Sequence, residues 1–132
     1  MLFRKASFVS LCTLGLALVA GQARADHETT QFKGPKANTG RAIHSESSGK
    51  LVLTLSKDFV IPNTPAPHWQ VVDSRGNVYL LQQMKIKSGT NRSITLPSYI
   101  SDVAKVQVWC SWAEALLGEA TFENPARIAS GR

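Results

Sequence analysis

The sequence predicts an all-β protein, an antiparallel β-sandwich or barrel-like single domain. Apolar and polar residues alternate with a period of two in several short segments, as expected of strands that bury one face. Turn-forming residues recur at intervals of about 8 to 12 residues, a spacing typical of sandwiches and barrels. The segment richest in helix-forming residues, 112–117, is too short to form a helix alone.

The first 25 residues have the features of a secretion signal. Two basic residues precede an apolar run from about residue 8 to residue 20, and the small-x-small motif Ala23-Arg24-Ala25 follows it. The run is shorter than the about 20 residues that a membrane-spanning helix needs. We therefore expect cleavage after Ala25 and a secreted or periplasmic protein with no transmembrane segment after processing.

Cleavage there leaves 132 − 25 = 107 residues, the size of one domain. Residues 26–39 and 123–132 carry little periodicity, so we expect a poorly ordered lead-in, a β domain over 40–122 and a flexible tail. Three of the fifteen basic residues leave with the signal and the nine acidic residues stay, so the net charge falls from +6 to +3. The remaining basic residues are scattered, which argues against a nucleic-acid groove.

The first half of the domain contains three expected strands, residues 50–56, 68–74 and 78–86. The sequence SRGN joins the last two as a hairpin turn that tolerates positive φ at Gly76 and Asn77. Residues 60–68, VIPNTPAPH, hold three prolines within six residues, which favours a loop or an edge path. The apolar positions that align on one face in these strands are Leu51, Leu53, Leu55, Val78, Leu80, Met84 and Ile86.

The second half is expected to add strands at residues 92–96, 104–110 and 119–122. Pro97 ends the first of them. Residues 98–103 are expected to form a loop or one helical turn, and Gly118 permits a bend before the closing strand. The aligned apolar positions here are Ile94, Leu96, Val106, Val108, Ala120 and Phe122.

Cys110 is the candidate redox thiol. The chain has two cysteines, and Cys12 would leave with the signal, so the processed chain keeps one thiol and can form no intrachain disulfide. Cys110 continues the strand face of Val106 and Val108, where a free cysteine behaves as a small buried hydrophobe. A working thiol needs a cation or a helix N-terminus nearby, and Lys105 is placed on the opposite face. The residues leave the inert and the functional interpretation open.

Metal and haem sites receive less support from the sequence. A blue-copper site takes two histidines, a cysteine and a weak methionine. His27, His44, His68 and Met84 supply these types, but neither histidine nor methionine follows Cys110. The Cys-x-x-Cys-His haem motif is absent, and one cysteine is too few for a cysteine-rich zinc site. No metal ligands and no cofactor are therefore assigned, while haem or copper at Cys110 stays open.

Two histidines and two tryptophans are candidate binding residues. His44 precedes a turn-like stretch, and His68 stands where the proline-rich segment enters a strand. Trp109 lies on the face opposite Cys110, so it is either capped by a loop or part of a binding surface. Trp112 is expected to cover the thiol together with residues 60–68. No hydrolytic motif and no Gly-rich phosphate loop is found, so we expect no catalysis by the domain alone.

Several of these segments together resemble the DM13 domain family. The resemblance covers about residues 34–122, and its most specific part is the pair Trp109-Cys110 followed by Gly118 and Ala120. The segments that carry it are GRAIHSE, GKLVLTLSKDF, PAPHWQVVDSRGNVYLL, ITLP and VQVWCSWAEALLGEATF. The resemblance implies an electron-transfer module in which Cys110 acts as a thiol or ligates a prosthetic group.

The family often accompanies haem-binding DOMON domains, and this sequence contains no such neighbour. The resemblance therefore implies a redox or cell-envelope partner in trans. Two hypotheses follow. The chain is an exported redox or electron-transfer accessory that acts through Cys110, or it is a non-catalytic binding module of the cell envelope in which Cys110 is an inert core residue.

Overall fold

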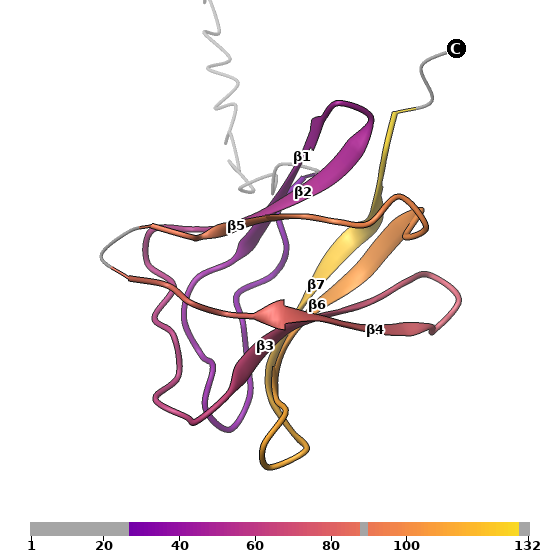
Figure 1. Ribbon diagram of the computed structural model, residues 1–132. Helices are drawn as coiled ribbons and strands as arrows, with labels where there is room; N and C mark the ends of the chain where they lie inside the picture. The colour runs from indigo at the N-terminus through magenta and orange to yellow at the C-terminus, as the bar shows by residue number, and fades with distance from the viewer. Residues whose placement is uncertain (1–26, 88–89, 130–132) are drawn as a thin grey trace, which may run out of the picture.

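The computed structural model describes residues 27–87 and 90–129, and their regular structure consists of strands alone. The three-stranded antiparallel sheet has the order β1-β2-β5, with β1 (Ala42–Ser47), β2 (Lys50–Leu55) and β5 (Ser93–Thr95). The four-stranded antiparallel sheet has the order β4-β3-β6-β7, with β3 (Pro67–Val72), β4 (Val78–Gln83), β6 (Asp102–Cys110) and β7 (Ala115–Arg127). The predicted all-β fold is confirmed (Figure 1), whereas the expected signal peptide lies outside the described residues.

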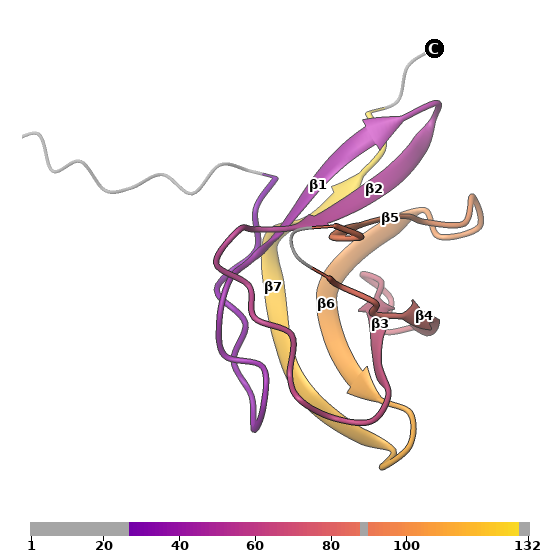
Figure 2. The same cartoon turned by 60° about the vertical axis from the view of Figure 1, so that its left-hand side comes forward.

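The segment before β1 joins the two sheets. Its residues 28 and 29 form bridges with Ile43 of β1 and Phe122 of β7, and Lys33 pairs with Glu119 further along β7. Figure 2 shows the long β7 curving up toward β1 and β2 on this side. The strands therefore run in series from β5 through β2, β1, this segment, β7, β6 and β3 to β4. The sandwich is closed like a barrel on one side, and β4 and β5 are the two ends of the series.

This segment is part of the fold, so the expected poorly ordered lead-in over residues 26–39 is wrong for the described residues 27–39. Thr29, Phe32 and Ala37 are fully buried. The Thr29 hydroxyl accepts a hydrogen bond from Ala42 N at 2.9 Å and donates one to Thr30 O at 2.7 Å. The segment pairs at single bridges rather than along a ladder, and for that reason its sequence lacks a period-two pattern.

The flexible tail expected over residues 123–132 is wrong for residues 123–127, which belong to β7. β7 continues to Arg127, and Ala126 within it is buried. β1 was not among the expected strands, since only Ala42 at its start is buried and no alternation follows. Residues 111–114 form a turn rather than the start of a helix, and β7 begins directly after it at Ala115.

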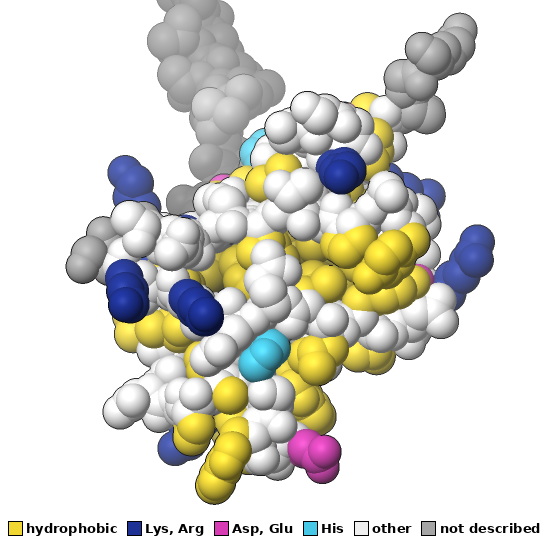
Figure 3. All heavy atoms as spheres, in the orientation of Figure 1, with side chains coloured by type: hydrophobic (Ala, Val, Ile, Leu, Met, Phe, Trp, Pro, Cys, Tyr) yellow, Lys and Arg dark blue, Asp and Glu magenta, His cyan; other side chains and the backbone are white. Residues whose placement is uncertain are grey.

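One continuous hydrophobic core lies between the sheets. The expected core residues of β2, β5, β6 and β7 are buried, as are Leu96 and Met84. Val78 and Leu80 were assigned to the wrong face, because they are 58% and 53% exposed while Tyr79 and Leu81 pack against the core. The first four residues of β4 are all apolar, so the sequence does not show which of its two faces is buried. Between β5 and β4, apolar side chains reach the surface in a broad band with basic residues at its margins (Figure 3).

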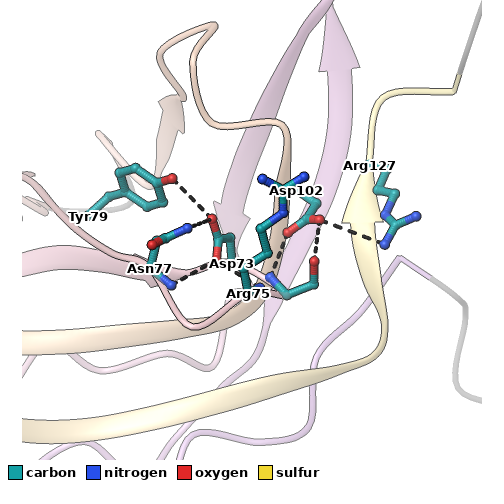
Figure 4. Close-up of polar contacts among 7 residues, drawn as sticks. Asp73, Arg75, Asn77, Tyr79, Asp102 and Arg127 are labelled. Atoms are coloured by element: carbon teal, nitrogen blue, oxygen red, sulfur yellow. Dashed lines mark hydrogen bonds and ion pairs between the residues drawn. The ribbon is translucent and has the colours of Figure 1, made fainter.

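The turn between β3 and β4 is held by one carboxylate (Figure 4). Asp73 accepts hydrogen bonds from the backbone N–H groups of Arg75 and Asn77, from the Asn77 side-chain amide and from the Tyr79 hydroxyl, at 2.8–3.0 Å. The Asn77 amide is the main cause that holds the pKa of Asp73 below its ordinary value, and the bond to Asp73 raises the pKa of Tyr79. Gly76 takes the expected positive φ, 87°, and Asn77 does not.

Candidate functional site

Cys110 is the last residue of β6 and lies at one end of the four-stranded sheet. It pairs with Pro67 of β3 on one side and with Ala115 of β7 on the other. Its side chain is 1% exposed and belongs to the core together with Val106 and Val108. The predicted strand face is therefore confirmed, and the thiol is enclosed.

A backbone N–H of the turn after β6 is directed at the sulfur. The turn of residues 111–114 folds back over the end of β6, with Glu114 at a φ of 51°, and Ala113 N donates a hydrogen bond to Cys110 Sγ at 3.4 Å. This N–H is the main cause that lowers the pKa of Cys110, with smaller contributions from the N–H groups of Trp112 and Ala66, while burial acts in the opposite direction. The donors supply the thiolate stabilisation for which the sequence offered no cation.

The cover of the thiol comes from the proline-rich segment and not from an indole. Ser111 N donates to Ala66 O at 3.1 Å, which ties the turn to this segment. The Thr64 hydroxyl is buried and has no hydrogen-bond partner among the described residues, and as a polar group near the sulfur it lowers the pKa of Cys110. Trp112 is 77% exposed, so the expectation that it covers Cys110 is wrong. The turn carries its indole outward into solvent.

His68 and Trp109 are cross-strand neighbours on the outer face of the four-stranded sheet. They pair directly between β3 and β6, and Leu116 of β7 lies on the other side of Trp109. Both side chains are half-buried, and His68 Nδ1 is 2.9 Å from Ala66 O. Trp109 is therefore part of a sheet surface. Because Ala66 also accepts the bond from Ser111, His68 contacts the same segment that covers the thiol.

The next row of this outer face is a polar chain across three strands. Gln70 Nε2 donates to Gln107 Oε1 at 2.7 Å, and Gln107 Nε2 donates to Glu119 Oε2 at 2.9 Å. Lys105 forms an ion pair with Glu119 at 3.8 Å. Leu80 of β4 lies opposite Gln70 and is exposed, so the outer face combines an ordered polar row with apolar side chains.

His44 lies on the other sheet, on β1, apart from the four residues just described. Its ring contacts Phe122 at 5.5 Å and His27 at 6.1 Å between centroids, both edge-on. Its Nδ1 atom is buried and has no hydrogen-bond partner within the described part of the chain. Burial, followed by the neighbouring His27, lowers the pKa of His44 and so favours the neutral imidazole. The structure thus brings Cys110, His68, Trp109 and Trp112 to one end of β6 and leaves His44 out.

No group of three or more histidine, cysteine, aspartate or glutamate side chains within residues 27–87 and 90–129 is placed to hold a metal ion. A cavity of about 660 Å³ lies elsewhere, at the β2–β5 edge, lined by Thr54, Leu55, Lys57, Asn91, Arg92 and Ser93. Arg92 there donates to the carbonyls of Ser56 and Phe59, both at 2.7 Å, so its charge serves to tie the loop after β2 to the start of β5.

Comparison of the chain with family models, with curated proteins and with solved structures found no match. The DM13 resemblance therefore stays a prediction from the residues that carry it. The described part of the chain contains no helix that is long and apolar enough to cross a membrane. The class that the fold and the site define is a small all-β domain with an enclosed, hydrogen-bonded thiol at the end of one strand.

Proposed function

We propose that this protein is an exported, DM13-like redox accessory in which Cys110 is a shielded thiol that reacts with a partner protein. The observation that carries the proposal is the set of hydrogen-bond donors around the sulfur, led by Ala113 N. A cysteine that only fills space needs no such donors, because its S–H is a weak hydrogen-bonding group. Donors directed at the sulfur favour the thiolate, which is the nucleophilic form.

The chemistry follows from the single thiol. The Cys110 thiolate attacks a disulfide of a secreted or periplasmic partner, an S–S bond forms between the two proteins, and one partner sulfur leaves as a thiolate. A second thiol of the partner then attacks this mixed disulfide and regenerates the Cys110 thiolate. The partner then has a disulfide between a different pair of its cysteines, so the cycle exchanges the partner's disulfide pairing and consumes no oxidant.

The partner reaches the sulfur only when its cover moves. Cys110 is 1% exposed, and the cover consists of the turn at residues 111–114 and the segment at residues 64–66. Both are loops at one end of the sheet, so they can open without separating the sheets. Shielding of this kind protects a lone thiol from oxidation in an oxidising compartment and leaves it available to a docked partner.

The test is the rate of thiol labelling in the native state. We expect iodoacetamide to label Cys110 in the native protein more slowly than in the denatured chain, but faster than the rate of global unfolding. Because labelling then depends on local opening of the cover, low concentrations of denaturant should not change its rate. Pro65→Ala loosens the covering segment and should raise the rate. Pro97→Ala makes the same change in the loop before β6, at the end of this strand opposite Cys110, and is the matched control. Oxidised glutathione should give a mixed disulfide detectable by mass spectrometry in the native protein.

A second candidate is a binding module of the cell envelope, favoured by the outer face of the four-stranded sheet. Half-buried Trp109 and His68 share this face with Val78 and Leu80, which are more than half exposed. Apolar residues on a sheet face beside an ordered polar row are typical of interaction surfaces. If Cys110 is labelled only at the rate of global unfolding, the redox proposal is wrong and the binding module is favoured.

A further inference from the structure

β4 is an edge strand that is exposed on both of its faces. Among the described strands it pairs with β3 alone. Val78 and Leu80 are exposed on its outer face, and Tyr79 and Leu81 on its inner face are only half-buried. In an antiparallel sheet every second residue of an edge strand directs its N–H and C=O groups away from the sheet. The free edge of β4 can therefore pair with one more strand.

The edge of β4 lacks two common protections against such pairing. Natural proteins place charged residues or proline in exposed edge strands, whereas β4 reads VYLLQQ and contains neither. Apolar side chains also reach the surface between β4 and β5, the two ends of the strand series (Figure 3). Tyr99 belongs to this region, because it is 70% exposed and its ring centroid lies 6.0 Å from that of Tyr79. An unprotected apolar edge of this kind is a template for strand addition.

The charge on this open side of the barrel has one sign. Residues 74–101 run from the turn before β4 to the loop before β6, and they contain no acidic residue and four basic ones, Arg75, Lys85, Lys87 and Arg92. Lys85 and Lys87 come just after β4, are exposed and take part in neither of the two ion pairs of the described residues. Arg75 shares its turn with the Asp73 carboxylate. The unbalanced positive charge therefore lies at the carboxyl end of β4, where a partner strand should carry acidic residues.

This charge argues against a second copy of the chain as the partner. A two-fold dimer that pairs β4 with β4 is antiparallel, and the carboxyl end of each strand then lies beside the β3–β4 turn of the other. Lys85 and Lys87 of one copy would lie near Arg75 of the other, and like charges placed opposite each other destabilise a strand pair. The Asp73 carboxylate of that turn already accepts four hydrogen bonds within its own copy. A partner with acidic residues fits this edge better.

We propose that β4 binds an extended segment of another protein as an additional antiparallel strand, in which acidic residues precede a stretch of alternating apolar residues. Antiparallel pairing places the amino-terminal end of the segment beside Lys85 and Lys87, and this fixes the order of its acidic and apolar residues. The apolar residues of the segment face the open side between β4 and β5. The proposal goes beyond the thiol chemistry and does not depend on it, because β3 separates β4 from the strand of Cys110.

The test is the binding of a labelled peptide to the full chain, measured by fluorescence anisotropy. Two glutamates precede alternating valine and threonine residues that match the six residues of β4 in length. The reversed sequence has the same composition and places the glutamates away from Lys85 and Lys87, so it should bind more weakly. Two further peptides are N-methylated on alternate residues, which removes the N–H groups along one edge or the other. One of them should bind like the parent peptide and the other should not bind.

Variants of the protein test the charge and the apolar surface separately. Lys85→Gln combined with Lys87→Gln should weaken binding at low salt by about 1.5- to 5-fold for each charge, the range of an exposed ion pair, and should reduce its salt dependence. Lys33→Gln combined with Lys36→Gln removes the same charge from exposed positions on the closed side of the barrel and is the matched control. Cys110→Ser should bind the peptide as wild type does, so a failure of the redox proposal stays distinguishable.

Three results would overturn the proposal. The first is no binding at about 1 mM peptide, or equal binding of both N-methylated peptides, because neither is compatible with a strand added to one edge. The second is sedimentation as a dimer that Leu80→Glu dissociates, which would assign the edge to a second copy. The third is binding of vesicles that contain anionic lipid, lost in the Lys85 and Lys87 double variant, together with equal binding of the two peptide orders; the open side would then be a lipid-binding surface.

Discussion

The backbones of Gly34 and Gly118 are in direct contact where the N-terminal segment crosses β7. A Cβ atom added at Gly34 would stand 2.4 Å from Gly118 Cα, and one added at Gly118 would stand 2.4 Å from Ala37 O. Lys36 N and Ala37 N both donate to Leu117 O, at 2.9 and 2.8 Å, so the two backbones are tied at this distance. The crossing therefore has room for glycine alone at both positions. Glycine is required here for lack of space and not for backbone conformation, because neither residue takes a positive φ.

Gly118→Ala should therefore destabilise the protein by about 1 to 3 kcal/mol or more, as overpacking does. Urea unfolding measures the free energy of unfolding. Gly49→Asn is the control, because nothing lies within 4 Å of a Cβ there and asparagine tolerates the φ of 73°. A Gly118→Ala variant as stable as the control would mean that the segment does not cross β7 this closely.

Leucines at two positions test which faces of β2 and β4 are buried. Leu53 is fully buried, so Leu53→Ala should cost about 2 to 5 kcal/mol. Leu80 is 53% exposed, so Leu80→Ala should change the free energy of unfolding by less than about 0.5 kcal/mol. Equal losses in the two variants would restore the sequence-based assignment of Leu80 to the core.

Phe32 tests whether the N-terminal segment belongs to the fold. Its ring is fully buried and packs edge-on against Phe59 at 5.2 Å between centroids. Phe32→Ala should cost about 3 to 5 kcal/mol. Lys36→Ala, at an exposed position of the same segment, should stay within about 0.5 kcal/mol of wild type. A neutral Phe32→Ala variant would support the disordered lead-in that the sequence suggested.

Asp73 should give the protein a stability that depends on acid pH. Its pKa is lowered in the folded state, so its contribution is fully present above the ordinary carboxyl value of about 3.9 and is lost as the pH falls through the lower folded value. Asp73→Asn should flatten the melting temperature over this range and lower it at neutral pH. Tyr79→Phe removes one of the four hydrogen bonds but leaves the carboxylate, so it should keep the pH dependence. Comparing the two variants separates the effect of the Asp73 charge from the effect of a single hydrogen bond.

Cys110 should tolerate serine at least as well as alanine. A serine hydroxyl can accept the bond from Ala113 N, whereas alanine leaves this donor without an acceptor. We expect Cys110→Ala to melt at the lower temperature of the two, and both variants to lose mixed-disulfide formation. The reverse order of melting temperatures would show that the site is governed by apolar packing and that the donors contribute little.

The strands with strict alternation could be predicted from the sequence, and those with uniform composition could not. Leu51, Leu53 and Leu55 alternate with polar neighbours, and only one face of β2 could be buried. Val78 and Leu80 stand in a run of four apolar residues, so their direction depends on a register shift in β3 between His68 and Gln70 that no local pattern records. Phe32 is a single apolar residue in a polar stretch, and its burial follows from a contact with a distant strand.

The position of Cys110 on the core face was predictable, but its surroundings were not. The donors to its sulfur come from a turn whose conformation, with Glu114 at positive φ, is set by where β7 begins. The pairing of His68 with Trp109 depends on the β3–β6 register across some forty residues of sequence. Side-chain types indicated the candidates, and only the tertiary arrangement showed which of them share a site.

The bridging segment has a consequence for the order in which the chain can fold. Thr121 N donates to the Thr30 hydroxyl across a sequence separation of 91 residues, so the contact between the N-terminal segment and β7 waits for the last strand. A chain that emerges amino terminus first from a ribosome cannot complete this closure until Thr121 has emerged. Distant pairings of this kind also make folding slow. The topology therefore delays closure of the barrel side until β7 is free to pair with the N-terminal segment.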